Sequence, residues 1–313
     1  MLKTLAPLAL AAGLALIPGL SVAADPVAIP GLEERTLISK AGLPYRIFIA
    51  VPKEPPPTAG YPVAYVLDGN SVAGTLADIV RTQTRAQGGL MEPALMVAIG
   101  YPGDAPINMT RRALDLTSVK ATPQKGSWTY LTPEGTGGAD AFLAFIEDEL
   151  KPVIAGAFRV DPSRQALIGH SFGGLFTLHV LFTRPAAFST YVAASPSLWW
   201  ADGAVLKEAD GLAGRLPKPP RRVLITVGAY EQDLHPALRD REDSEALARK
   251  LAERRMVDSA RDLAAELAAL PGAPLDVTLF VIPGQTHTSA APYALLMGLA
   301  AFLGPVPAGE GRR

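Results

Sequence analysis

Continuous apolar runs alternate with helix-like patterns along most of the chain. The runs are short, rich in Val, Ile and Tyr, and end at glycine, proline or turn residues, as buried strands do. Between them, apolar residues recur at the spacing of a helix with one buried face. Strands of this kind belong to parallel sheets, so the pattern predicts an α/β fold with a mainly parallel central sheet and helices on both faces. The expected strands are 45–51, 62–67, 94–99, 164–168, 189–194, 222–227 and 275–282, and the expected helices are 72–87, 139–158, a segment ending near 182, 239–270 and 290–303.

Two stretches depart from this alternation. Residues 101–137 are polar and rich in Pro, Gly and Thr, and a loop of that length in a compact domain is usually functional. Residues 202–220 are expected to be loop and linker. The sequence contains no internal repeat, so one domain is expected.

The first 24 residues have the pattern of a secretory signal peptide. Lys3 supplies the positive start, residues 5–20 are apolar, and Val22-Ala23-Ala24 suits cleavage before Asp25. The apolar stretch is shorter than the ~20 residues that a membrane-spanning helix needs. We therefore expect a leader over 1–24 and a single domain over 25–313, located in the periplasm or outside the cell, with no membrane insertion after cleavage.

Composition narrows the classes of function. The 313 residues are 49% hydrophobic, and 29 Lys and Arg against 30 Asp and Glu give a net charge of −1. A nucleic-acid partner is not expected, because such binding needs a basic surplus. The absence of cysteine excludes disulfides, cysteine nucleophiles and thiolate metal sites.

A candidate nucleophile lies at the motif Gly169-His170-Ser171-Phe172-Gly173, which matches G-x-S-x-G between an expected strand and an expected helix. The strand turns so sharply into the helix that a Cβ at Gly169 or Gly173 would collide with neighbouring backbone. The turn presents the Ser171 hydroxyl at the helix N-terminus, where backbone N–H groups favour a developing negative charge. We interpret Ser171 as a nucleophile rather than as a capping serine in a glycine-rich turn.

A serine nucleophile needs a base, and the chain has four histidines. His170 directly precedes the serine and cannot fold back onto it. His179 lies eight residues into the following helix, about 12 Å along its axis. Of the remaining two, His287 directly follows the last expected strand, at the edge where parallel sheets place their chemistry, so it is the predicted base. His235 is expected to be a loop residue.

The third catalytic group should be a carboxylate that orients the base. It should follow a strand between the serine and His287, and the strand at 222–227 is followed by a loop containing Glu231 and Asp233. Sequence spacing does not separate these two candidates, because the loop conformation decides which one reaches the histidine.

Short motifs follow one another in a fixed order along the chain. They are Leu67-Asp68-Gly69-Asn70, Ala98-Ile99-Gly100-Tyr101, Arg112-Ala113-Leu114-Asp115-Leu116-Thr117, Gly169–Gly174, Ala194-Ser195-Pro196-Ser197-Leu198-Trp199-Trp200, Val227–Gln232 and Gly284–His287. Together they resemble the putative-esterase branch of the α/β-hydrolases. Within that branch they are most similar to periplasmic esterases that cleave trilactone catecholate siderophores such as enterobactin and salmochelin. The likeness covers roughly residues 30–303 and implies the α/β-hydrolase fold.

The resemblance implies a role for each matching residue. Ser171 and His287 would be nucleophile and base, and Glu231 is favoured over Asp233 as the acid. The oxyanion hole would use the Phe172 N–H and a second N–H from the turn after the strand at 62–67, near Gly69 or Asn70.

The resemblance also assigns substrate contacts. Arg112 would hold the anionic substrate, and a guanidinium in a partly dry pocket can pair with catecholate or ester oxygens. The alternative for Arg112 is a structural ion pair with Asp115, three residues on. From the chemistry of their side chains, Trp199 and Trp200 are expected to wall a pocket for flat aromatic rings, with core packing as the alternative.

These residues predict a serine hydrolase that cleaves carboxylic esters through an acyl-enzyme, with the trilactone backbone of a catecholate siderophore as the expected substrate. No metal or organic cofactor is required, because proton transfer activates the nucleophile, and any iron would arrive with the substrate. One alternative is a broad carboxylesterase for short acyl or phenolic esters. Another is a periplasmic protein that binds a ligand without cleaving it.

Overall fold

The computed structural model describes residues 28–122, 131–272 and 274–304, so the expected leader at 1–24 lies outside the described residues. These residues form one sheet of eight strands in the order β1-β2-β4-β3-β5-β6-β7-β8. Strand β2 runs antiparallel to both its neighbours, and all the other neighbouring strands pair in parallel. The strands are β1 (Leu32–Ile38), β2 (Pro44–Ala50), β3 (Tyr61–Leu67), β4 (Leu95–Gly100), β5 (Val160–His170), β6 (Thr190–Ala194), β7 (Arg221–Gly228) and β8 (Leu275–Ile282).

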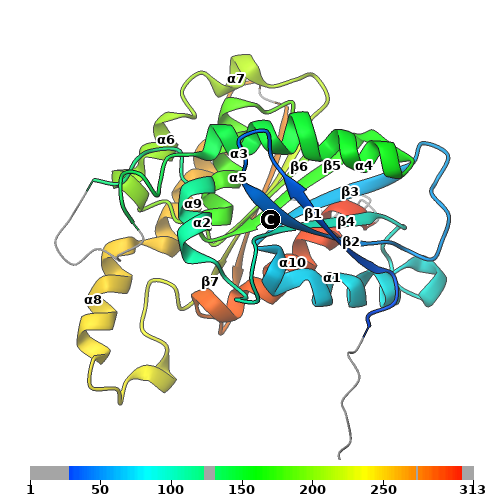
Figure 1. Ribbon diagram of the computed structural model, residues 1–313. Helices are drawn as coiled ribbons and strands as arrows, with labels where there is room; N and C mark the ends of the chain where they lie inside the picture. The colour runs from blue at the N-terminus through cyan, green and yellow to red at the C-terminus, as the bar shows by residue number, and fades with distance from the viewer. Residues whose placement is uncertain (1–27, 123–130, 273, 305–313) are drawn as a thin grey trace, which may run out of the picture.

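Helices connect the strands and cover both faces of the sheet (Figure 1). The α-helices are α1 (Gly69–Thr82), α2 (Met109–Asp115), α3 (Ala139–Phe145), α4 (Lys151–Ala157), α5 (Phe172–Thr183), α6 (Ala204–Lys207), α7 (Leu212–Arg215), α8 (Ser244–Arg254), α9 (Met256–Ala268) and α10 (His287–Leu303). A π-helical turn, η2 (Ile146–Leu150), joins α3 to α4, and 3₁₀ turns lie at η1 (Arg85–Gln87), η3 (Trp200–Gly203) and η4 (Pro236–Leu238).

The core has two layers, one on each side of the sheet. In β3, Val63, Tyr65 and Leu67 pack in the cluster that also contains buried side chains of α3, α5 and α9. The alternate residues Ala64 and Val66 pack with α1 and α10 on the other face. Successive strand residues point to opposite faces, so every position of a doubly covered strand must be apolar. The α/β fold expected from the apolar runs is confirmed.

Each expected strand is present, but the sequence did not predict β1. This strand lies at the edge of the sheet, and its residues LEERTLI are only partly buried. An edge strand that carries charges lacks the continuous apolar pattern from which the inner strands were recognised.

Three connecting segments differ from expectation. The polar stretch at 101–137 contains helix α2, whose start is capped by the Asn108 side chain accepting a hydrogen bond from the Arg111 N–H at 3.1 Å. The expected linker at 202–220 carries the short helices α6 and α7. The expected single helix at 239–270 is two helices, because Arg255 adopts φ 47° and ψ 37° between α8 and α9. Such a left-handed conformation at a residue other than glycine has no clear sequence signal.

Candidate active site

Ser171 occupies the sharp turn between β5 and α5. Its φ of 62° and ψ of −117° are rare for a residue with a side chain, and strain of this kind is typical of functional sites. The Ser171 N–H donates to the Ala194 carbonyl at 2.9 Å, which ties the turn to the end of β6. The hydroxyl is therefore presented where the parallel strands end.

The glycines around Ser171 differ in how closely other atoms approach them. A Cβ on Gly169 would lie 2.3 Å from the Gly173 carbonyl oxygen, so the predicted collision there is confirmed. The prediction for Gly173 is wrong, because a Cβ at that position would come no closer than 3.5 Å, to the Leu67 Cδ1. The second close approach is at Gly174, where a Cβ would lie 2.7 Å from the Ala194 carbonyl oxygen.

His287 lies beside Ser171 although 116 residues separate them. Its Nε2 is 2.9 Å from the Ser171 Oγ. His287 is the first residue of α10 rather than a loop residue, and the turn before it is fixed by the Thr286 N–H donating to the Ser289 Oγ at 2.9 Å. The structure therefore brings together the predicted nucleophile and the predicted base.

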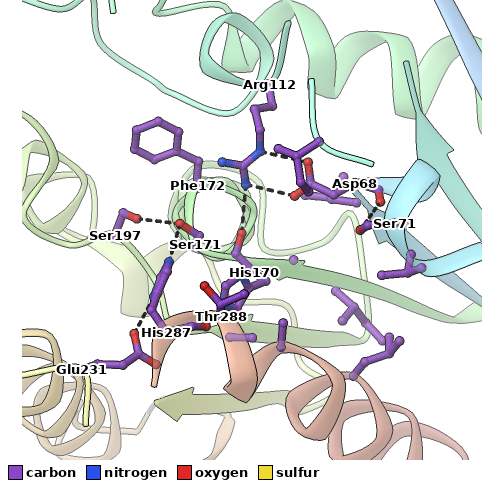
Figure 2. Close-up of a pocket in the computed structure, with 18 of the residues that line it drawn as sticks. Asp68, Ser71, Arg112, His170, Ser171, Phe172, Ser197, Glu231, His287 and Thr288 are labelled. Atoms are coloured by element: carbon purple, nitrogen blue, oxygen red, sulfur yellow. Dashed lines mark hydrogen bonds and ion pairs between the residues drawn. The ribbon is translucent and has the colours of Figure 1, made fainter. Parts of the chain in front are cut away.

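Glu231 lies on the other side of the imidazole ring. Its Oε2 is 2.6 Å from the His287 Nδ1 (Figure 2). Its Oε1 accepts hydrogen bonds from the Ser195 hydroxyl at 2.6 Å and the Gly228 N–H at 2.7 Å. Burial opposes ionisation of Glu231, but the bonds from His287, Ser195 and Gly228 outweigh burial and lower the pKa of the carboxyl group. Asp233 is exposed and makes no such contact with His287 among the described residues.

These distances determine what each atom can do. The ionised Glu231 accepts a hydrogen bond, so the His287 Nδ1 must carry the proton that is shared between them. The His287 Nε2 is then free of a proton and can accept one from the Ser171 hydroxyl. Because Glu231 fixes the tautomer, the imidazole is already oriented to act as a general base.

His170 makes a second link between the serine turn and α10. Its Nε2 lies 2.9 Å from the His287 carbonyl oxygen, and because a carbonyl only accepts, His170 donates. Burial lowers the pKa of His170 to about 4, so the ring is neutral at pH 7. The remaining histidines lie elsewhere: His179 pairs with Glu208 at 2.7 Å, and His235 caps a 3₁₀ turn by accepting the Ala237 N–H.

The two turns expected to form the oxyanion hole lie beside the serine. Phe172, the first residue of α5, lines the cavity around Ser171. In the turn after β3, Asp68 lines the cavity, whereas Gly69 and Asn70 are not among the described lining residues. Gly69 packs against β4, and the Asn70 side chain bonds the Tyr101 backbone at both its N–H and its carbonyl. In this turn it is thus Asp68, rather than Gly69 or Asn70, that lines the cavity.

Arg112 lines the cavity but does not pair with Asp115. It donates to both carboxylate oxygens of Asp68 at 2.9 Å and to the His170 carbonyl at 3.2 Å (Figure 2). Asp115 instead faces Arg111, with 3.6 Å between the closest nitrogen and oxygen. Adjacent residues of a helix point in different directions, so Arg111 takes the carboxylate on its own helix while Arg112 turns towards the end of β3. The structural ion pair considered for Arg112 thus exists, but with a different partner.

The two tryptophans have different surroundings. Trp199 lines the cavity. Trp200 belongs to the core and packs edge-on against Phe172, with 5.2 Å between ring centroids. The expectation of an aromatic pocket wall therefore holds for the position of Trp199, and the core-packing alternative holds for Trp200.

A cavity of about 540 Å³ opens above the serine, within the size range of small-molecule sites. Most of its wall is apolar. Sequence reasoning missed Ser197, whose Oγ lies 3.3 Å from the Ser171 Oγ. It also missed wall residues from the long polar stretch and from the charged helical segment, since neither carries a recognisable motif; they are Ile107, Met109, Leu251, Arg254 and Met256.

In 28–122, 131–272 and 274–304, no group of three or more His, Cys, Asp or Glu side chains is arranged to hold a metal ion. Within the same residues, no helix combines the length and the apolar character needed to cross a membrane.

Comparison with known proteins gives consistent matches. Residues 39–262 match the family described as "Putative esterase". The chain is 38% identical over 288 residues to the ferri-bacillibactin esterase BesA of Bacillus subtilis, covering 88% of this chain and 91% of BesA. It is 34% identical over 292 residues to the siderophore triacetylfusarinine C esterase of Aspergillus fumigatus, covering 88% and 94% of the two chains.

A solved structure agrees with these relatives. The BES protein from Bacillus cereus superimposes with a TM-score of 0.76 and 35% sequence identity, covering 91% of this chain and 100% of that one. The fold, the serine turn and the family match lead to one assignment. The protein belongs to the "Putative esterase" family and is an ester hydrolase with the α/β-hydrolase fold.

Proposed function

We propose that this esterase hydrolyses the ester backbone of a siderophore, using Ser171 as nucleophile, His287 as general base and Glu231 as the orienting carboxylate. The observation that carries the proposal is the hydrogen-bonded chain from Ser171 through His287 to Glu231, with spacings of 2.9 and 2.6 Å, at the base of the large cavity. Two relatives that each align over 88% of the chain support the substrate class, because one is named a ferri-bacillibactin esterase and the other a siderophore triacetylfusarinine C esterase.

In the proposed reaction, protons pass between Ser171, His287 and the leaving alcohol. His287 takes the Ser171 proton as the Oγ attacks an ester carbonyl, and Glu231 stabilises the resulting imidazolium. The alcohol leaves with the proton from His287, and water then hydrolyses the acyl-enzyme by the same route.

The tetrahedral oxyanion would be held by the backbone N–H groups of Phe172 and Asp68, which both line the cavity. Each such donor typically lowers the barrier by about 3 kcal/mol. Arg112 fixes this arrangement, because its guanidinium bonds both the Asp68 carboxylate and the His170 carbonyl.

The apolar wall suits a substrate with flat aromatic rings, which Trp199 would contact. A catecholate siderophore has such rings, and the iron would be part of the substrate rather than a resident cofactor. We further propose that residues 1–24 are a signal peptide and that residues 25–313 act as one domain in the periplasm or outside the cell.

The test is product analysis by mass spectrometry after incubation of the purified protein with a trilactone catecholate siderophore, iron-loaded and iron-free. Cleavage to linear products that is lost in Ser171→Ala supports the proposal. Turnover of p-nitrophenyl acetate without cleavage of either trilactone would indicate a broad carboxylesterase instead. Failure of a fluorophosphonate probe to label folded wild-type protein at Ser171 would favour a ligand-binding protein without catalysis.

A further inference from the structure

The helix pair α8–α9 contributes one wall of the active-site cavity. Leu251 and Arg254 lie three residues apart on α8, so both side chains project from the same side of the helix. The left-handed Arg255 turns the chain so that Met256, at the start of α9, extends the same wall. Leu251, Arg254 and Met256 all line the cavity. Helix α8 itself has no buried residue and stands away from the sheet in Figure 1.

Arg254 is stacked on an aromatic ring within this wall. Its guanidinium carbon lies 4.5 Å from the centroid of the Trp199 ring, a distance typical of cation–π contact. A planar guanidinium held over a ring keeps donor groups at its edge, where they can bond anionic oxygens. Arg254 is partly exposed, so a ligand in the cavity can reach it.

Arg254 is one of four charged residues, leaving histidines aside, in the described cavity wall. Among the described lining residues, the carboxylates are Asp68 and Glu231 and the cations are Arg112 and Arg254. Asp68 offsets Arg112, because the two side chains share two hydrogen bonds. Glu231 is bonded to His287, Ser195 and Gly228, so both carboxylates of the described wall are engaged, and Arg254 adds a positive charge beside Trp199.

We propose that Arg254, stacked on Trp199, is a specificity-determining residue that makes the cavity prefer the anionic iron-loaded siderophore over its iron-free form. This inference rests on the proposed function. A ferric tris-catecholate carries several negative charges, whereas the phenols of the iron-free trilactone are largely protonated at pH 7. Charge-assisted bonds from the Arg254 fork therefore discriminate between the two forms, while the ester bonds to be cleaved are the same in both.

The test measures binding separately from catalysis. In Ser171→Ala protein, which holds the ester uncleaved, isothermal titration calorimetry gives Kd for the ferric and the iron-free trilactone catecholate at pH 7. Adding Arg254→Gln is expected to raise Kd for the ferric form about tenfold, in line with the strength of hydrogen bonds to charged groups. The Kd for the iron-free form should stay unchanged. Arg254→Lys, which keeps the charge but loses the planar fork, should give an intermediate Kd for the ferric form.

Arg249→Gln is the matched control. Arg249 lies on the same helix, its side chain is 69% exposed, and its nearest carboxylate is Glu245 at 3.9 Å. This variant removes the same charge away from the cavity and should leave both Kd values as they are. The circular dichroism spectrum of Arg254→Gln should match that of the wild-type protein, which shows that the variant is folded.

The inference is overturned if Arg254→Gln weakens the binding of both forms equally, if it leaves Kd for the ferric form unchanged, or if neither form binds. These outcomes are distinct from failure of the proposed function. If the ferric ligand binds through Arg254 but wild-type enzyme cleaves no trilactone, the proposed function fails and the binding preference stands. If wild-type enzyme cleaves trilactones while Arg254→Gln changes nothing, only the inference fails.

Discussion

At the scale of single residues, burial separates two carboxylates that look alike in the sequence. Glu231 is 1% exposed and receives bonds from three donors, so it stays ionised in a dry position. Asp233, two residues on, faces solvent. A carboxylate can orient an imidazole only if its own position is fixed, and the Ser195 and Gly228 donors fix that of Glu231.

Glu231→Gln is predicted to lower kcat by about 10³–10⁴-fold, the loss seen when an amide replaces a triad carboxylate and stabilises the wrong tautomer. Steady-state kinetics with p-nitrophenyl acetate measures this, and circular dichroism confirms that the variant is folded. Asp233→Asn is the matched control and should keep the wild-type kcat. An equal loss in the two variants, or in Asp233→Asn alone, would contradict the proposed role of Glu231.

Sequence reasoning found the residues of the site that have local or positional signals. Ser171 lies in a motif, and His287 remained after the other histidines were eliminated. The choice of Glu231 needed the resemblance to a family, because the loop backbone decides which carboxylate turns inward. The partner of Arg112 had no local signal at all, since Asp68 is 44 residues earlier and meets it only through the fold.

At the scale of elements, the turn between β5 and α5 depends on close approach of backbone atoms. The strand enters the turn at Gly169, and the first turn of α5 crosses directly over it, within 2.3 Å of where a Cβ would lie. Gly173 lies on the helix itself, and the atoms nearest to a Cβ at this position would be side-chain atoms at ordinary contact distance. The two flanking glycines of one motif therefore differ in their tolerance of a methyl group.

Gly169→Ala is predicted to destabilise the protein by more than about 3 kcal/mol, the upper range for overpacking, because backbone atoms cannot move aside as side chains do. Gly173→Ala should leave stability unchanged or raise it by up to about 1 kcal/mol, since alanine favours a helix over glycine. Urea unfolding of both variants measures the difference. Equal destabilisation of the two would show that the contacts at Gly173 are tighter than the structure has them.

Elements were predictable where their burial was uniform. The inner strands are buried on both faces, so each appears as a continuous apolar run. The edge strand β1 and the short helix α2 lack that pattern, because only part of their surface is covered. The break between α8 and α9 was invisible for a different reason: helix propensity continues through Arg255, and nothing in the local sequence marks its left-handed conformation.

At the scale of the whole molecule, the proposed leader predicts a defined product. Expression of the complete chain in a bacterial host with a secretion pathway should yield a mature protein that begins at Asp25. Intact mass and N-terminal sequencing of the periplasmic fraction test this, with an Ala24→Pro variant as the control that should block cleavage. Recovery of the uncleaved chain from the cytoplasm would contradict the proposed leader.

The stability of the whole molecule should also depend on one carboxyl group outside the active site. Asp115, at the end of α2, is 2% exposed and faces Arg111 and the buried Tyr45 and Tyr101. Burial raises the pKa of Asp115 from 3.8 to about 6, although the attraction of Arg111 opposes the increase. The folded state thus binds this proton more tightly than the unfolded state does. Its contribution to stability is full below pH 3.8 and is lost as the pH rises to about 6.

Asp115→Asn removes this titration. As the pH rises from 4 to 7, the unfolding free energy of the variant should therefore increase relative to that of the wild type by up to about 3 kcal/mol. The absolute stability of the variant also includes the lost attraction to Arg111, and for that reason the pH dependence of the difference is the quantity to measure. Urea titrations of both proteins across this range provide it. A difference that stays constant with pH would mean that Asp115 is ionised in the folded protein throughout, and that Arg111 compensates fully for its burial.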